Sequence, residues 1–167
     1  AGRAKTLLKN VELAGIRNAI VMSETPERIA ERLPHFFDKI LVDAPCSGEG
    51  MFRKEPDMVK SWDAEMLAFC RSEQAKILEA CAPMLKAGGM LLYSTCTFSP
   101  EENEKSIGDF LERHPEFELM PIAKKNGFAE GLAPYTDCAR LYPHRLKGEG
   151  HFLAPVSYTH LRAHETR

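Results

Sequence analysis

An alternation of short apolar runs with amphipathic stretches constrains the fold of this chain more than any other feature. The runs at residues 19–22, 39–43 and 90–95 are largely apolar and have the length of strands. Between them, apolar residues recur at intervals of three and four, which is the period of one helix face. Strands that alternate with helices form a parallel sheet covered by helices, so we predict an α/β fold.

Two of the helical stretches have recognisable starts. Thr25 can cap a helix that has Pro26 in its first position and Glu27 near its positive end, and about two turns fit before Leu33. Residues 99–102 carry a Ser and a Glu three positions apart, which is a capping box and predicts the start of another helix.

The longest helical stretch extends from residue 62 to residue 85. Its apolar positions follow helical spacing: Met66, Phe69, Cys70, Ile77, Ala80, Cys81, Met84 and Leu85. We expect Gly88 and Gly89 to end this helix. Since Cys70 and Cys81 lie on its apolar face, we expect both to be buried.

Composition and charge indicate one ordinary globular domain. The chain has 167 residues and a formal net charge of −2, without the basic excess of a free-standing nucleic-acid-binding domain. No apolar run approaches the roughly 20 residues that cross a bilayer, so we expect no membrane contact. The five cysteines are odd in number and include no Cys-x-x-Cys pair, which predicts reduced thiols, a cytoplasmic location and no bound metal.

Both ends of the chain lead us to expect a fragment of a longer protein. The chain starts without Met, inside a predicted helix whose apolar side consists of Leu7, Leu8, Val11 and residues 13–16. Residues 117–120 and 151–154 are predicted to be the last strands. Residues 157–167 lose all periodicity, so we assign residues 1–156 to a partial domain and the remainder to a non-native or disordered tail.

Three chemically active side chains follow the predicted strands. Asp43 ends one strand, Cys46 lies three residues later, and Cys96 directly follows the strand at residues 90–95. In open α/β sheets, ligands bind beyond the carboxyl ends of the strands. Two thiols and an acid in one cleft suit covalent catalysis, in which a thiolate attacks an electron-poor carbon and an acid manages the proton.

Several segments carry a specific resemblance to a known family. Residues 43–54 (DAPCSGEGMFRK) and 93–104 (YSTCTFSPEENE) resemble motifs IV and VI of the Nol/Nop/Sun family of RNA cytosine-5 methyltransferases. Within it, the bacterial 16S ribosomal RNA methyltransferase F group is the most similar. Residues 140–144 (RLYPH) and 148–154 (GEGHFLA) resemble the last motif of the family, so the resemblance covers essentially residues 1–155.

The resemblance implies a class I methyltransferase that uses S-adenosylmethionine. Such a fold is Rossmann-like, with a mostly parallel sheet and helices on both faces, and here its N-terminal strands would be missing. Carbon 5 of cytosine is too weak a nucleophile to take a methyl group unaided, but addition of a thiolate to carbon 6 makes the ring an enamine. In the family, the residue corresponding to Cys96 attacks, the one corresponding to Cys46 assists elimination, and the one corresponding to Asp43 hydrogen-bonds the pyrimidine.

The resemblance also implies binding residues. Asp43 and Pro45 would lie beside the cofactor, and Ser23 would line its pocket. Arg53 and Lys54 would contact phosphates of the RNA partner, which we expect to be ribosomal, although a solvated charge pair explains them equally well. The family's Gly-rich loop and ribose-binding acid have no counterpart here, so we expect the isolated chain to bind the cofactor poorly and to be inactive. We expect a monomer.

Three alternatives compete with this interpretation, and the residues argue against the first. Enzymes that methylate exocyclic amines carry Asp/Asn-Pro-Pro-aromatic at this junction, whereas here Cys46 follows Pro45 and no aromatic residue comes next. A cysteine hydrolase would pair Cys46 or Cys96 with His144. A non-catalytic RNA-binding module would keep the fold without the chemistry. We interpret His144 and His151 as structural or RNA-facing rather than catalytic.

Overall fold

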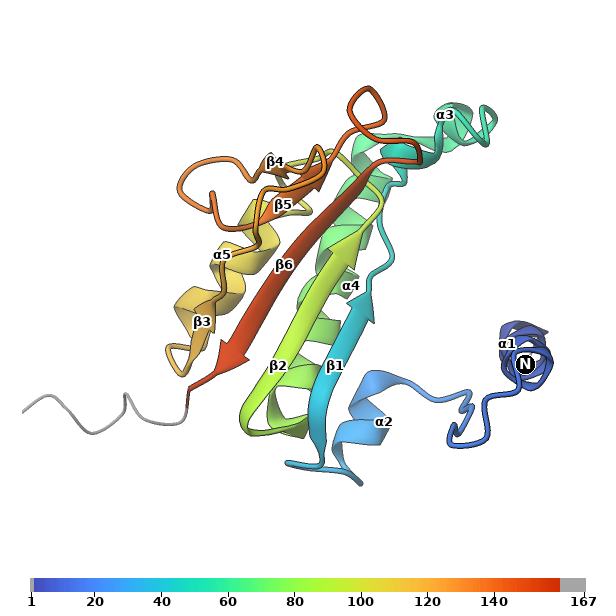
Figure 1. Ribbon diagram of the computed structural model, residues 1–167, viewed down its shortest axis with the longest axis vertical. Helices are drawn as coiled ribbons and strands as arrows, with labels where there is room; N and C mark the ends of the chain where they lie inside the picture. Colours follow the sequence, from blue (N-terminus) through green and yellow to red (C-terminus); the bar gives the residue numbers. More distant parts are fainter. Residues whose placement is uncertain (1, 160–167) are drawn as a thin grey trace, which may run out of the picture.

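A six-stranded sheet packed against helices makes up the computed structural model, which describes residues 2–159 (Figure 1). Its helices are α1 (Gly2–Leu13), α2 (Pro26–Ala30), α3 (Met58–Ser61), α4 (Ala64–Cys81) and α5 (Glu104–Arg113), with short 3-10 helices η1 (Glu49–Met51) and η2 (Ala82–Met84). Its strands are β1 (Phe37–Asp43), β2 (Leu85–Thr95), β3 (Phe117–Leu119), β4 (Ala129–Glu130), β5 (Ala139–Leu141) and β6 (His151–Tyr158).

The sheet is mixed in the part of the chain that the structure describes. Its order is β1-β2-β6-β5-β4, and β3 also pairs with β6. Only β1 and β2 are parallel, while β6 is antiparallel to β2, β3 and β5, and β4 is antiparallel to β5. The carboxyl ends of β1 and β2 therefore lie at the same end of the sheet as the start of β6, at the top of Figure 1.

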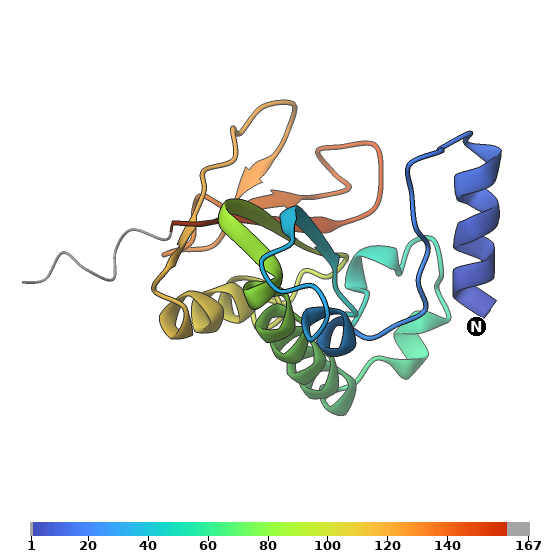
Figure 2. The same cartoon turned by 90° about the horizontal axis from the view of Figure 1, so that it is seen from below.

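Three helices cover one face of this sheet. Figure 2 shows α2, α4 and α5 side by side on that face, and α2 and α5 both contact α4. A parallel pair such as β1 and β2 needs a crossover connection, which α4 supplies, whereas antiparallel neighbours need none. The predicted α/β class is thus confirmed, but for residues 2–159 the sheet is less parallel than expected, and the helices occupy a single face.

The core lies between the two central strands and the helices. β2 and β6 contribute Leu91, Tyr93, Phe152, Ala154 and Val156, all fully buried. Other fully buried core side chains come from the helices: Leu78, Ile107 and Phe110. Burial of Cys70 and Cys81 on α4 confirms that prediction, whereas Phe69 is 64% exposed.

Most of the predicted strands and the predicted start of α2 are confirmed, with one strand as an exception. β1, β2, β3 and β6 contain or overlap the runs predicted as strands, and α2 starts at Pro26 but ends at Ala30, before Leu33. The prediction of a strand at residues 19–22 is wrong, because this stretch is irregular and Ile20 is 86% exposed. A strand needs a hydrogen-bonded neighbour, and none pairs with this run in residues 2–159.

The end of the long helix is also corrected. α4 is followed at once by η2, which contains Pro83, and proline lacks the N–H that would continue a helix. β2 begins directly after η2, so Gly88 and Gly89 lie inside a strand. There the β1–β2 register shifts between Phe37 and Lys39. Gly88 has a φ of 77°, a backbone conformation that glycine adopts without strain and that such an irregularity in a strand often requires.

The predictions for the two terminal segments have different outcomes. The predicted N-terminal helix is confirmed as α1, but its apolar residues are exposed, among them Leu7 at 53% and Leu13 at 76%. Ser157 and Tyr158, which the sequence assigned to the tail, belong to β6, while residues 160–167 lie outside the described residues. Among residues 2–159, no helix combines the length and apolarity needed to cross a membrane.

Candidate active site

Two loops leave the same end of the sheet side by side. Because β1 and β2 are parallel neighbours, with Asp43 opposite Ser94, the loops at residues 44–48 and 96–99 begin together. Their side chains bring the Sγ atoms of Cys46 and Cys96 to 3.3 Å from each other. Both thiols are half-buried, so neither is enclosed in the core. The structure thus joins the two predicted cysteines in one site that remains open to solvent.

The two thiols differ in acidity. The hydrogen bond from Cys46 lowers the pKa of Cys96 to about 7, against the raising effects of burial and of the Asp43 charge. The same hydrogen bond, together with burial, raises the pKa of Cys46, because its proton is held between the two sulfur atoms. A thiolate is the nucleophilic form of cysteine, so Cys96 is the thiol prepared to attack at neutral pH.

The remaining cysteines have the opposite character. Burial raises the pKa of Cys70, that of Cys81 to about 11 and that of Cys138 to about 12. These three thiols are protonated at neutral pH, and Cys96 alone has a lowered pKa among the cysteines. Of the five cysteines, Cys96 is therefore the one whose surroundings favour the thiolate at neutral pH.

The predicted acid lies beside the thiols. Asp43 is exposed as the last residue of β1, and its charge acts on Cys96. Pro45 is exposed in the following loop, and its carbonyl oxygen accepts a hydrogen bond of 2.8 Å from Nε2 of Gln74 on α4. The Asp43 charge thus reaches Cys96, and Pro45 directly precedes Cys46 in the loop.

A buried carboxyl group on the Cys96 side holds the Cys46 loop. Glu102 is fully buried, and its Oε1 accepts hydrogen bonds from the Ser47 N–H at 2.9 Å and from Nε2 of Gln74 at 3.1 Å. Its Oε2 accepts the Ser47 hydroxyl at 2.5 Å. The predicted capping box is therefore wrong. The Glu102 side chain is used across the site, and α5 begins only at Glu104, after a turn at residues 100–103.

A second carboxyl group forms the reciprocal contact. Oε2 of Glu49, in η1 directly after the Cys46 loop, accepts hydrogen bonds from the Phe98 N–H at 2.9 Å and from the Thr97 hydroxyl at 3.0 Å. The segment after each loop thus supplies one carboxyl group that binds an N–H and a hydroxyl of the other loop. We call Glu49 and Glu102 the cross-clamp, and infer that it fixes the separation of the two cysteines.

A close approach of two glycines completes the joint between the loops. The Gly50 N–H donates to the carbonyl oxygen of Cys96 at 2.9 Å, and the Gly150 N–H donates to the Gly50 carbonyl at 3.4 Å. A Cβ atom on Gly50 would lie 2.5 Å from the Gly150 oxygen and 2.8 Å from the Cys96 oxygen. Backbone atoms cannot yield to such a contact, so glycine is required at position 50.

An ion pair supports the Cys96 loop from its far side. Arg140 on β5 and Glu104 on α5 have side chains only 3% and 7% exposed, and Nε of Arg140 donates to Oε1 of Glu104 at 2.7 Å. Burial opposes the charge of Arg140, but the Glu104 carboxylate outweighs it and raises the arginine pKa. Nη1 of Arg140 also donates to the Phe98 carbonyl at 2.9 Å, which ties the pair to the loop.

Other predicted site residues lie apart from the thiols. Ser23 is exposed and lines a separate hollow with Arg28 and Arg32, which shares no lining residue with the cysteine loops. Arg53 and Lys54 are both exposed just after η1. Nη2 of Arg53 donates to the Gly148 carbonyl at 2.8 Å, so this arginine faces the segment that precedes β6.

His144 does not form the pair that a cysteine hydrolase requires. Its ring is stacked against Tyr142, with ring centres 5.3 Å apart. Within residues 2–159, no hydrogen bond joins His144 to Cys46 or Cys96, whose sulfur atoms contact each other. Among the described residues, the thiols therefore have no imidazole base.

Sequence reasoning missed the residues that support the cysteines. Gln74 gave a usable signal, because it is a polar residue four positions after Cys70 on an otherwise apolar helix face, and it is fully buried. Glu49 and Glu102 lie within the motifs that contain the cysteines, but no local pattern indicates that each reaches the opposite loop. Their role becomes visible only when the two loops are placed side by side.

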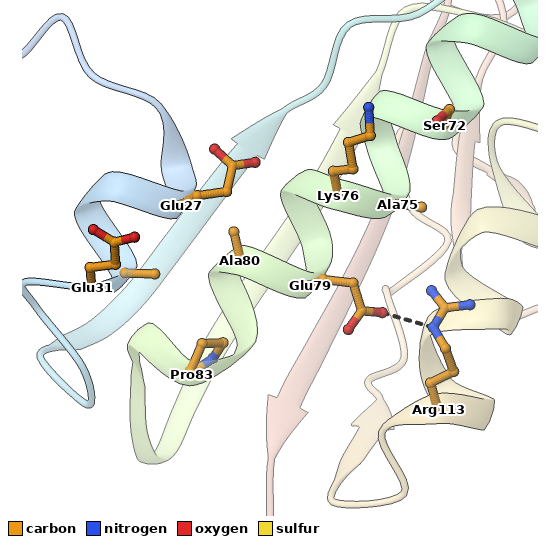
Figure 3. A pocket seen from close by; sticks show the side chains of 10 residues that line it. Glu27, Glu31, Ser72, Ala75, Lys76, Glu79, Ala80, Pro83 and Arg113 are labelled. Atoms are coloured by element: carbon orange, nitrogen blue, oxygen red, sulfur yellow. Dashed lines mark hydrogen bonds and ion pairs between the residues drawn. The ribbon is translucent and has the colours of Figure 1, made fainter.

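A hollow of about 880 Å³ lies elsewhere, between α2 and α4 on the helical face (Figure 3). Its charged lining includes Glu27, Lys76, Glu79 and Arg113, and Nε of Arg113 contacts Oε1 of Glu79 at 2.7 Å. These side chains are substantially exposed, and no lining residue belongs to the cysteine loops. We call this the helix-face hollow and do not assign the chemistry to it.

Comparisons with known proteins agree on one family. The sequence model for 16S rRNA methyltransferase RsmB/F matches residues 1–157. The chain is 32% identical over 167 residues to the ribosomal RNA small subunit methyltransferase F of Serratia proteamaculans, covering 96% of this chain and 34% of the relative. It thus spans about a third of the length of the curated relatives that it matches.

Two solved structures share the fold. A methyltransferase homolog protein from Pyrococcus horikoshii has a TM-score of 0.74 and 33% identity, covering 93% of this chain and 50% of that one. NSun6 from Pyrococcus horikoshii, solved with SFG, has a TM-score of 0.81 and 24% identity, covering 94% of this chain and 39% of that one. The first of these supports the Rossmann-like methyltransferase fold that the sequence predicted, and the second adds likeness in fold alone.

Proposed function

This chain belongs to the 16S rRNA methyltransferase RsmB/F family, and we propose that it carries the catalytic cysteines of an enzyme that methylates carbon 5 of cytosine in ribosomal RNA. The observation that carries the proposal is the thiol pair, in which Cys46 and Cys96 lie 3.3 Å apart and Cys96 has a pKa of about 7. Covalent catalysis at neutral pH needs such an ionised sulfur. The thiol with the lowered pKa is also the one to which the family resemblance assigns the attack.

The residues present fit one side of S-adenosylmethionine, which would supply the methyl group on a positively charged sulfur. Asp43 and Pro45 are exposed beside the thiols, and the Asp43 carboxylate can accept a hydrogen bond from an amino group. We propose these two as cofactor contacts. Ser23 lines a different hollow, so the proposal does not extend to it.

The proposed chemistry begins with addition of the Cys96 thiolate to carbon 6 of the cytosine. A sulfur–carbon bond forms, and the electron pair of the carbon 5–carbon 6 double bond makes carbon 5 nucleophilic. Asp43 would hydrogen-bond the pyrimidine edge and favour the protonated ring as charge develops. This sequence requires the base to leave the stack and reach the half-buried thiol.

Elimination reverses the addition. Once carbon 5 carries the methyl group, its proton passes to water in the solvent-open site, the double bond re-forms, and the carbon 6–sulfur bond breaks with its electron pair on Cys96. A hydrogen bond from the Cys46 thiol, 3.3 Å away, stabilises the departing thiolate in the same way that it lowers the pKa of Cys96. We propose this as the physical basis on which Cys46 assists release.

Arg53 and Lys54 are the proposed phosphate contacts. Both are exposed next to the Cys46 loop, where a strand of RNA entering the site would pass. Phosphate contacts orient a nucleic acid without reading its bases, so these residues would add affinity rather than choose the cytosine.

Product analysis with two cysteine variants tests the proposal. A full-length protein that contains this chain is incubated with RNA and S-adenosylmethionine, and the nucleosides are separated after digestion. We expect 5-methylcytidine from the unsubstituted protein, none from Cys96→Ser, and a protein–RNA adduct that accumulates with Cys46→Ala. Loss of attack in Cys46→Ala with attack intact in Cys96→Ser would overturn it, and an N-methylated product would support the exocyclic-amine alternative.

A further inference from the structure

A basic hollow lies between the segment that follows the Cys46 loop and the segment that precedes β6. It measures about 400 Å³, and its charged or ionisable lining consists of Arg53, His144, Arg145 and Lys147. We call it the basic hollow. The 2.8 Å hydrogen bond from Arg53 to the Gly148 carbonyl joins the segment after Cys46 to the segment before β6 across it. A site whose ionisable side chains are all basic suits an anion such as a phosphate.

A row of stacked rings leads from the basic hollow toward Cys96. His144 is exposed and stacks on Tyr142 with 5.3 Å between ring centres and an angle of 24°. Tyr142 in turn stacks on Phe98 at 5.6 Å and 26°. Since Phe98 lies two residues after Cys96, this aromatic row, Phe98–Tyr142–His144, extends from the basic hollow to the loop that carries the attacking thiol.

The inner end of the aromatic row is held firmly. The Phe98 carbonyl accepts a hydrogen bond from the buried Arg140, and its N–H donates to Glu49 of the cross-clamp. The Phe98 ring lies against Gly150, where any Cβ atom would overlap it. The position of the row relative to Cys96 is therefore set by the same contacts that build the active site.

We propose that the basic hollow and the aromatic row form a subsite for one nucleotide next to the target cytidine in single-stranded RNA. Arg145 and Lys147, with Arg53, would neutralise its phosphate, and its base would stack on the outer face of His144. When one base is taken out of a stack, its neighbour loses a partner, and an aromatic ring can replace that partner. This inference rests on the proposed function and specifies how the substrate strand is held.

Salt-dependent binding tests the phosphate contacts. We would measure the affinity of a fluorescein-labelled, cytidine-containing 12-nucleotide RNA for the full-length protein by anisotropy. Loss of one neutralised phosphate of single-stranded RNA lowers the magnitude of the slope of log affinity against log salt by about 0.7. Between 1 M and 0.1 M salt, this is a difference of about 5-fold in affinity. We expect this smaller slope from the double variant Arg145→Ala/Lys147→Ala. The control Lys76→Ala/Arg113→Ala removes equal charge from the helix-face hollow and should leave the slope unchanged.

An abasic substitution tests the stacking. It is moved one position at a time along the RNA beside the cytidine. At one position we expect the unsubstituted protein to lose affinity on the order of tenfold, and His144→Ala to show no difference between intact and abasic RNA. The subsite is refuted if Arg145→Ala/Lys147→Ala has the slope of the control, or if no abasic position depends on His144.

Failure of the subsite and failure of the proposed function are separable. Trapping of RNA that contains 5-fluorocytosine by the unsubstituted protein reports the cysteine chemistry alone. If the adduct forms while the salt slopes of both double variants agree, the subsite is wrong and the function stands. If the adduct does not form, the proposed function fails whatever the slopes are.

Discussion

Replacement of Cys46 by alanine should raise the pKa of Cys96. The hydrogen bond from Cys46 is the largest influence that lowers this pKa to about 7 from its ordinary value of 9.0, while burial and the Asp43 charge act to raise it. Without Cys46, the pKa of Cys96 should therefore return to 9.0 or above. At pH 7 the thiolate fraction then falls from about one half to about 1%, which is a loss of about 50-fold.

Reactivity at a single pH would understate this change. A thiolate becomes more nucleophilic as its pKa rises, by about 6- to 10-fold for two pKa units, so the rate at pH 7 should fall only about 5- to 8-fold. The whole pH profile is the clearer measurement. Alkylation of Cys96 by iodoacetamide, followed by peptide mass spectrometry, should give an apparent pKa near 7 in the 167-residue chain and two or more units higher in Cys46→Ala.

The control is Cys70→Ala, which removes a buried thiol from α4. It should leave the apparent pKa of Cys96 near 7. An apparent pKa that stays near 7 in Cys46→Ala would refute the account of the thiol pair. The same shift predicts that Cys46→Ala forms the RNA adduct slowly at pH 7 and more readily at pH 9, because attack recovers with the thiolate while release stays impaired.

Three further substitutions test the contacts around the thiols. Glu102→Gln places an amide N–H against the buried N–H and hydroxyl donors, so the free energy of unfolding, measured by urea denaturation, should fall by about 1–3 kcal/mol. The control Glu101→Gln should have little effect, because this side chain is 46% exposed and its ion pairs with Arg71 and Lys105 lie at the surface. Gly50→Ala should cost about 1–3 kcal/mol and slow alkylation of the nearby thiolate, and normal stability with normal alkylation would contradict the glycine argument. Arg140→Ala leaves Glu104 buried and unpaired, so a loss of about 3–5 kcal/mol is expected, and a loss below 1 kcal/mol would show that the ion pair is not needed.

The joint position of the cysteines follows from local sequence patterns and one general rule. Each of two apolar runs ends next to a cysteine-bearing loop, and parallel neighbours bring their carboxyl ends to the same edge of a sheet. The structure pairs Asp43 with Ser94 at that edge and places Cys46 against Cys96. The shared position of the two cysteines can be predicted because each lies close in the sequence to the end of its own strand.

The supporting contacts depend on partners far apart in the sequence. Glu102 lies 55 residues from Ser47 and Glu49 lies 48 residues from Thr97, so local pattern assigned Glu102 to a capping box instead. The run at residues 19–22 has the composition of a strand but pairs with no strand among residues 2–159. Propensity and spacing describe what a segment can form, and the available partner decides what it does form.

The most direct test of the central claim is the identity of the sulfur that bonds the substrate. RNA with 5-fluorocytosine at the target position is trapped on the full-length protein, digested, and mapped by peptide mass spectrometry. The account predicts that the nucleotide is attached to the peptide containing Cys96. Attachment to Cys46 instead, or no covalent attachment while methyl transfer to ordinary RNA proceeds, would contradict it.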